Sequence, residues 1–218
     1  NSIRTVSEQS SDIPQLKYST KNENYVSAHR GGSGIKSYPE NCIETFDYLF
    51  KNGIQIFEID VAETKEGNLV LMHDNSLQRT STGRQDVNQV TLNQLKEYFL
   101  VDDFDNKTSF KIPTFKEALK WGKNKPIYFM VDIKKGVDYN DIIKEIKETT
   151  MQNQVVLVTY TIGQAKKMHQ LAPNMLLSVS MRNEREFNEM MNSGIAKDKM
   201  VAFTGTKRND PSLLKKIH

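Results

Sequence analysis

Two histidines, an arginine and a pair of carboxylates lie within fewer than fifty residues of this sequence. His29 and Arg30 come first, Glu58 and Asp60 are separated by one residue, and His73 follows. Histidine exchanges protons near neutral pH, arginine donates paired hydrogen bonds to phosphate, and clustered carboxylates bind hard divalent cations. This combination indicates cleavage of a phosphodiester at a metal ion.

The two carboxylates belong to the apolar run 54–61, which predicts a strand. Side chains at positions i and i+2 of a strand point to the same face, so Glu58 and Asp60 would share one crowded space. Two close anions repel each other unless a cation lies between them. Oxygen ligands favour Ca²⁺, Mg²⁺ or Mn²⁺ over zinc. The alternative is a pair of salt-bridged acids on an exposed strand face.

A second strand with polar residues at its end is predicted over 127–134. Asp132 is a candidate third metal ligand, and the Lys134 ammonium is a candidate partner for a non-bridging phosphate oxygen. Because the two charges are opposite and two residues apart, a simple ion pair at the end of the strand is the other interpretation.

His29 and His73 are the candidates for a general acid and a general base. Each lies at the end of a predicted strand, beside a charged neighbour. Arg30 follows His29 and can bind phosphate with both arms of its guanidinium, and the glycines at 31–32 allow close approach of the backbone. A structural histidine and an ordinary Gly-Gly turn are the alternatives for these positions.

Strand and helix patterns alternate along the chain, which favours βα units and a parallel sheet. Asn41 and Glu44 match a helix-capping pair, as do Thr91 and Thr114 with the residues three positions later. The predicted strands are 25–28, 54–61, 69–73, 127–133, 155–160, 176–181 and 200–204. They make six βα units and one hairpin strand. Polar residues late in the strands are typical of a βα barrel, although a doubly wound open sheet also binds ligands at that edge.

Composition excludes several classes of protein. The net charge is only +3, with dispersed Lys and Arg residues, which argues against a nucleic-acid binder. No apolar run approaches the roughly 18 residues of a membrane span, so we expect no stable membrane insertion. Cys42 is the sole cysteine and is expected to be a buried thiol. Residues 1–24 are a polar lead segment beginning at Asn1, which favours export to a periplasmic or extracellular space over a cytoplasmic location.

Several short motifs occur together and in a fixed order along this chain. In these motifs the chain resembles the glycerophosphodiester phosphodiesterases. The resemblance covers residues 25–218, is densest over 25–134, and extends in fold and chemistry to bacterial phosphatidylinositol phospholipases C. The motifs are His29-Arg30-Gly31, Pro39-Glu40-Asn41, Glu58-Ile59-Asp60-Val61, Thr64, His73-Asp74, Arg79-Thr80 and Ile112-Pro113-Thr114.

The resemblance implies an α/β fold of the TIM (β/α)₈ type and hydrolysis of a small-molecule glycerophosphodiester to glycerol 3-phosphate and an alcohol. One divalent metal, Ca²⁺ or Mg²⁺, would be held by Glu58, Asp60 and Asp132. His29 and His73 would be the acid/base pair. In such enzymes a neighbouring glycerol hydroxyl attacks phosphorus, and water then opens the cyclic phosphodiester.

The resemblance implies that Arg30 binds the phosphate. The residue pattern of the strand over 127–134 makes Lys134 a second candidate for phosphate binding. The chain departs from the family in two respects. The family usually has Glu where this chain has Asp132, and aspartate is one methylene shorter. The chain also ends at His218 after a sixth βα unit, so the barrel lacks its last two strands here. We expect the natural protein to be longer.

Two other functions remain open at this level. A phospholipase acting on intact lipids would need an exposed apolar rim, for which Tyr98, Phe99 and Leu100 are the candidates. A non-catalytic phosphate-binding module would be expected to lack one histidine or the carboxylate pair, and this chain has all four. The sequence identifies neither the leaving alcohol nor the oligomeric state.

Overall fold

A computed structural model describes residues 26–206 and 211–217. These residues form a seven-stranded sheet in the order β1-β2-β4-β5-β6-β7, and β3 pairs with β2 at a corner. The six strands of the main order are parallel, whereas β3 is antiparallel to β2. The strands are β1 (Ser27–Ala28), β2 (Ile56–Glu63), β3 (Leu69–Leu71), β4 (Tyr128–Ile133), β5 (Val155–Val158), β6 (Leu176–Ser180) and β7 (Met200–Phe203).

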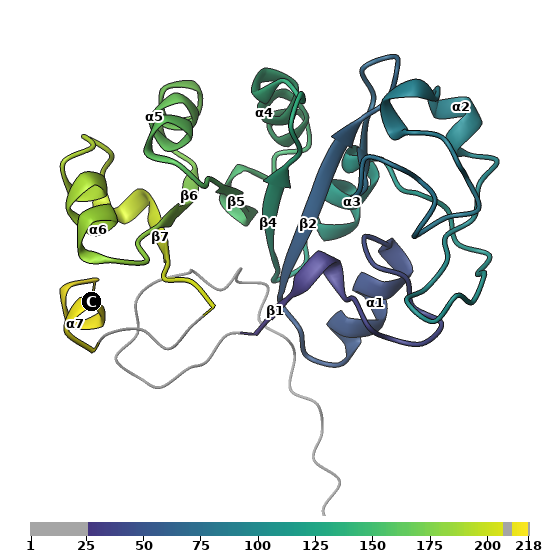
Figure 1. Cartoon of the computed structure of the whole chain (residues 1–218), viewed down its shortest axis with the longest axis horizontal. Coiled ribbons are helices and arrows are strands. Elements are labelled where there is room, and N and C mark those ends of the chain that lie inside the picture. The colour runs from purple at the N-terminus through teal and green to yellow at the C-terminus, as the bar shows by residue number, and fades with distance from the viewer. Residues whose placement is uncertain (1–25, 207–210, 218) are drawn as a thin grey trace, which may run out of the picture.

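The strands curl into a half-barrel, with α4, α5 and α6 on its outer side (Figure 1). This confirms the predicted α/β fold with six βα strands and one hairpin strand. The helices are α1 (Ile43–Lys51), α2 (Leu92–Leu95), α3 (Phe115–Gly122), α4 (Tyr139–Glu148), α5 (Ile162–Leu171), α6 (Glu184–Met191) and α7 (Pro211–Ile217). Capping boxes at Thr91, Thr114 and Thr161 open α2, α3 and α5.

Successive side chains of β2 point alternately into the core and to the concave face of the half-barrel. Phe57, Ile59 and Val61 are fully buried and belong to the main core, together with residues of the outer helices. The intervening residues Ile56, Glu58 and Asp60 point to the opposite face, since successive strand side chains alternate. The burial of one face therefore fixes where the two carboxylates point.

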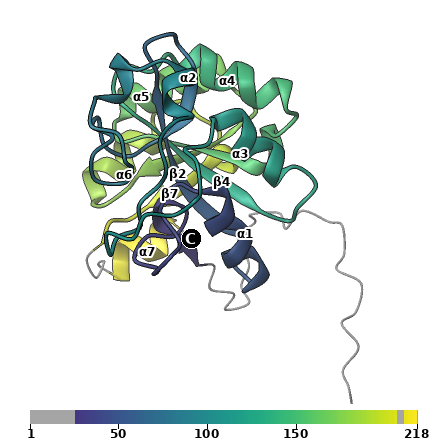
Figure 2. The same cartoon turned by 90° about the vertical axis from the view of Figure 1, so that its right-hand side faces the viewer.

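Residues 74–111, here the 74–111 segment, connect β3 to α3. The segment lies on the β2 side of the half-barrel in Figure 1, the side that faces the viewer in Figure 2. Its own apolar cluster includes Leu77, Val90 and Leu95, packed against Val70 of β3. The proposed lipid-facing rim is wrong: Leu100 is buried at 1% exposure, and Phe99 is half-buried beneath two lysine ammoniums.

One local prediction is wrong. Asn41 does not cap a helix, because α1 begins after Cys42 and Asn41 bonds elsewhere. Cys42 is buried, as expected, and burial raises its thiol pKa to about 12. The lead segment 1–24 lies outside the described residues, as does Asp210 of the Asp210-Pro211 pair, which predicts a helix start. That the natural protein is longer stays a prediction.

Candidate active site

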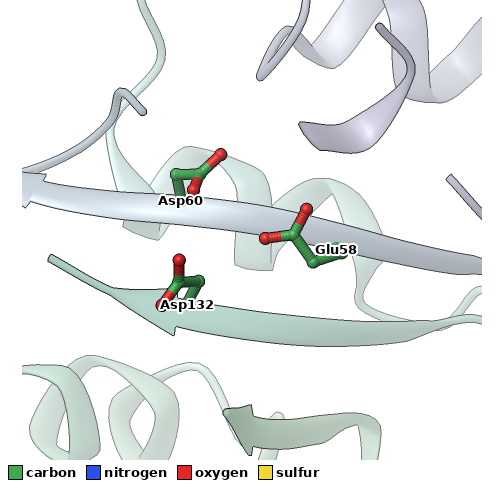
Figure 3. A group of neighbouring side chains, drawn as sticks. All are labelled: Glu58, Asp60 and Asp132. Carbon is green, nitrogen blue, oxygen red and sulfur yellow. The ribbon is translucent and has the colours of Figure 1, made fainter. Parts of the chain in front are cut away.

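Three carboxylates from the neighbouring strands β2 and β4 lie close together on one face of the sheet (Figure 3). Oxygens of Glu58, Asp60 and Asp132 lie within 4.8 Å of one another. Glu58 and Asp60 come from β2 and Asp132 from β4, and the parallel register pairs Asp60 with Asp132 directly. Because the pairing puts both aspartates at the same height of the sheet, the cluster follows from the register.

The carboxylate cluster carries more negative charge than the described residues neutralise. The Lys134 ammonium lies 2.6 Å from Asp60 Oδ1 and 2.9 Å from Asp132 Oδ2, so it pairs with two of the three acids. Burial, and then the charge of Asp60, raise the pKa of Glu58 to about 7. An oxygen-rich, under-neutralised cluster of this kind fits a hard divalent cation.

Asn41 fixes the orientation of Asp60, which the sequence analysis missed. Its Nδ2 donates to Asp60 Oδ2 at 2.9 Å, and its Oδ1 accepts from the Asp60 backbone N–H at 3.0 Å. Asn41 adopts a left-handed backbone, with φ of 51°. Asparagine tolerates this region better than most residues. Its side chain is therefore used to orient a carboxylate instead of capping α1.

The His29–Arg30 turn lies directly beside the carboxylates. Ala28 of β1 pairs with Phe57, so the next residue along each strand is His29 on one side and Glu58 on the other. The Arg30 backbone N–H donates to Glu58 Oε2 at 2.7 Å. Arg30 has a φ of 52°, a conformation that non-glycine residues adopt only when the surrounding structure holds it. The turn thus connects the histidine to the carboxylate cluster.

A buried glutamate joins two arginines next to this turn. The Glu40 side chain is 2% exposed and accepts from Arg30 Nη1 at 3.2 Å. It also accepts two hydrogen bonds from Arg79, at 3.0 and 2.7 Å. Burial alone would raise the pKa of Glu40, but the bonds and charge of Arg79, with those of Arg30, lower it. The sequence analysis gave neither Glu40 nor Arg79 a role.

Arg79 extends this network to the second histidine. Its Nε donates to Asp74 Oδ2 at 2.7 Å, and Asp74 Oδ1 lies 2.6 Å from His73 Nδ1. The hydrogen bond from Arg79 lowers the pKa of Asp74 well below its usual range, so the carboxylate stays ionised. With Nδ1 bonded to Asp74, Nε2 is the His73 nitrogen left for proton transfer.

Two further aspartates of the 74–111 segment hold the loop that follows His29. Asp102 Oδ2 accepts from the Ser37 backbone N–H at 2.6 Å, and Asp103 accepts from the Gly34 N–H. Asp103 also lies 3.8 Å from Arg79. The segment therefore supports both histidine-bearing stretches of backbone.

The predicted site residues fall into two connected groups. Glu58, Asp60, Asp132 and Lys134 form the carboxylate cluster, and Arg30 contacts it through its backbone. His73 connects to Arg30 through the side chains of Asp74, Arg79 and Glu40. His29 is exposed and lies one residue before the Arg30 N–H that contacts Glu58. The sequence signals for Asp74 were its adjacency to His73 and its place in the His73-Asp74 motif.

Tyr160 is another residue that sequence reasoning missed. It follows β5, and its hydroxyl donates to the Asp132 carboxylate. Burial, and then the charge of Asp132, raise the pKa of this hydroxyl. Tyr160 lines the same cavity as Asp132 and Lys134.

A sequence model described as the glycerophosphoryl diester phosphodiesterase family matches residues 29–189. A curated glycerophosphodiester phosphodiesterase of Caldanaerobacter subterraneus subsp. tengcongensis is 30% identical over 160 residues. That match covers 71% of this chain and 65% of the relative, so the chain spans less than two thirds of the relative's length.

Among solved structures, a glycerophosphoryl diester phosphodiesterase from Parabacteroides distasonis superposes with a TM-score of 0.85 and 30% identity. The superposition covers 92% of this chain and 69% of the other. A phosphodiesterase from Oleispira antarctica, solved in complex with the product sn-glycerol-3-phosphate, gives a TM-score of 0.62 at 21% identity over 89% and 88% of the two chains. In the described part of this chain, no helix has the length and apolar character needed to span a membrane.

Proposed function

The chain belongs to the glycerophosphoryl diester phosphodiesterase family, and we propose that it hydrolyses glycerophosphodiesters to glycerol 3-phosphate and a free alcohol. The observation that carries this proposal is the contact between the Arg30 N–H and Glu58, which joins the histidine network to the carboxylate cluster. A named phosphodiesterase relative and the glycerol 3-phosphate bound to the Oleispira protein support the same chemistry.

Glu58, Asp60 and Asp132 would hold one divalent cation, Ca²⁺ or Mg²⁺. When bound, such a cation polarises a phosphoryl oxygen and lowers the pKa of a nearby hydroxyl. Lys134 remains paired with Asp60 and Asp132, and its positive charge reduces their electrostatic repulsion of a bound phosphate. Asn41 holds Asp60 in its orientation before the cation arrives.

Arg30 is the proposed phosphate ligand. Its Nη1 is held by Glu40, and the Arg30 side chain is 24% exposed. A guanidinium carries several N–H donors in a planar fork, so those that Glu40 leaves unused can bind a non-bridging phosphate oxygen.

His29 and His73 would transfer the protons. One imidazole takes the proton of the glycerol 2-hydroxyl as its oxygen bonds to phosphorus, and the other protonates the departing alcohol oxygen. Water then attacks the cyclic phosphodiester, with the two imidazoles in reversed roles. Asp74 keeps the proton of neutral His73 on Nδ1, so Nε2 exchanges protons with the reactants.

The test is release of glycerol 3-phosphate from a panel of glycerophosphodiesters, with Ca²⁺, Mg²⁺ or chelator present. We expect turnover with at least one metal and its loss in chelator, restored by adding metal back. No release from any substrate with either metal present would refute the proposal. Hydrolysis of an intact phospholipid at a comparable rate would favour a phospholipase instead.

A further inference from the structure

A cavity of about 700 Å³ continues the site on its β5 side. It lies where β4 leads into α4 and β5 into α5, two neighbouring units of the half-barrel (Figure 1). Asp132 and Lys134 line it, so it opens directly onto the carboxylate cluster. Its volume is in the range of small-ligand pockets, and no step described above uses it.

The cavity carries an excess of positive charge. Lys135 and Lys167 line it, and neither ammonium pairs with a carboxylate of the described residues. Lys134 and Asp132 neutralise each other. Asp138 supplies the one further carboxylate of the lining, and it caps α4 by accepting from the Asn140 N–H at 2.9 Å. Two lysines against this one aspartate leave the cavity net positive.

The aromatic walls do not favour a cationic ligand. An aromatic face binds a quaternary ammonium through cation–π attraction. The Tyr139 face is already occupied, since Lys167 Nζ lies 5.1 Å from the centre of its ring. Tyr160 directs its hydroxyl to Asp132 and forms the wall next to the carboxylate cluster. A trimethylammonium group would meet lysine ammoniums here instead of a free aromatic cage.

We propose that this cavity binds an anionic group on the leaving alcohol through Lys135 and Lys167. The inference rests on the function proposed above. The glycerol half of a glycerophosphodiester is uncharged in every substrate. A charged pocket beside the phosphate can therefore discriminate between substrates only through the charge of the leaving alcohol. The enzyme thus prefers alcohols that carry a phosphate or carboxylate to neutral ones, and disfavours choline.

The test compares kcat/KM for glycerophosphodiesters that differ in the charge of the alcohol, with divalent metal added. Glycerophosphoglycerol is the neutral reference. The same compound phosphorylated on its leaving glycerol and glycerophospho-N-acetylserine supply the two anions, and glycerophosphocholine supplies the cation. We expect about a 1.5- to fivefold gain per favourable lysine contact for the anions over the reference, and a loss for choline.

Variants decide whether the two lysines cause the preference. In the Lys135→Gln/Lys167→Gln double variant, we expect the ratio of anionic to neutral kcat/KM to fall about two- to twentyfold. Lys166→Gln removes an exposed charge of the same helix outside the cavity and should leave that ratio unchanged. A higher kcat/KM for both anionic substrates supports recognition of negative charge in general. A higher kcat/KM for the phosphorylated substrate alone supports a pocket that binds phosphate specifically.

Two outcomes would overturn the inference in distinguishable ways. If glycerophosphoglycerol is hydrolysed but the anions gain nothing, or the double variant keeps the preference, only the pocket assignment fails. If no substrate is hydrolysed, the proposed function fails and the inference fails with it. Thermal melting of each variant checks that a lost preference does not come from unfolding.

Discussion

The carboxylates of the candidate site lie on strands, whereas its histidines and arginines lie on loops. Asp60 and Asp132 are placed by backbone pairing between β2 and β4, and the core behind them is fully buried. Arg79 and His73 are placed by ion pairs that join the 74–111 segment to the His29–Arg30 turn. One half of the site therefore depends on sheet register and the other on a polar network.

This difference predicts different responses to mutation. Substitution of a carboxylate should change metal binding and leave the surrounding strands intact, because their register does not depend on that side chain. Substitution in the polar network should also displace its neighbours, since each charged group there contacts at least one other.

The largest effect is expected from removing either proposed proton-transfer group. His29→Ala and His73→Ala should each lower kcat by about 10²–10⁴-fold, because proton transfer to or from the reacting oxygens is lost. Steady-state rates of glycerol 3-phosphate release measure this. His169→Ala, on α5 away from the site, is the control. A variant of either histidine with near-normal kcat would remove that residue from the mechanism.

A smaller loss is expected for Arg79→Gln, of about 10–100-fold in kcat. The substitution removes the hydrogen bonds that hold Asp74, and with it the orientation of His73. Arg79→Lys should recover only part of the rate. A single ammonium cannot reproduce the paired hydrogen bonds that the guanidinium donates to both Glu40 and Asp74.

The pH–rate profile separates this positioning role from a merely structural one. The apparent pKa of the limb assigned to the acid/base pair should shift in Arg79→Gln. It should not shift in Arg84→Gln, which replaces an exposed arginine of the same segment. Wild-type kcat and an unmoved profile in Arg79→Gln would show that the network does not position His73.

On the strand side, metal affinity should depend on pH through Glu58. Its pKa of about 7 without metal means that a proton must leave before the carboxylate can bind a cation. The apparent affinity for Ca²⁺ or Mg²⁺ should therefore weaken about tenfold between pH 8 and pH 6. Calorimetric titration measures this, and Glu58→Gln should abolish most of the pH dependence. Equal affinity at the two pH values would contradict the assignment.

The smallest effect on the rate per folded molecule is expected at the glycines of the turn. An alanine Cβ at Gly31 would lie 2.0 Å from Phe46 Cε1, and φ there is +66°. Gly31→Ala should lower the free energy of unfolding by about 2–4 kcal/mol. Gly34 has a similar φ but open space, so Gly34→Ala should cost only about 1–2 kcal/mol.

Denaturant unfolding of the two variants measures the contribution of packing against Phe46. Equal losses would mean that backbone conformation alone explains the cost, and that the turn is not held by close contact with α1.

Prediction from sequence succeeded where the cause is local. The spacing of Glu58 and Asp60 placed both on one strand face, and Thr114 and Glu117 gave a capping box because the two side chains need only neighbouring backbone. It failed at Asn41, whose short-range capping pattern lost to a hydrogen bond with Asp60 across the fold. Local patterns do not reveal which of two partners a polar side chain will choose.

By itself, the sequence determined the alternation of strands and helices, the paired acids, and the candidate histidines, since periodicity and spacing act over a few residues. Only the tertiary structure decided that Glu40 joins Arg30 to Arg79, that Asp102 and Asp103 hold the loop after His29, and that Tyr160 borders a cationic cavity. These contacts join residues far apart along the chain. Their geometry depends on how the sheet curls and where the 74–111 segment packs, which no local pattern encodes.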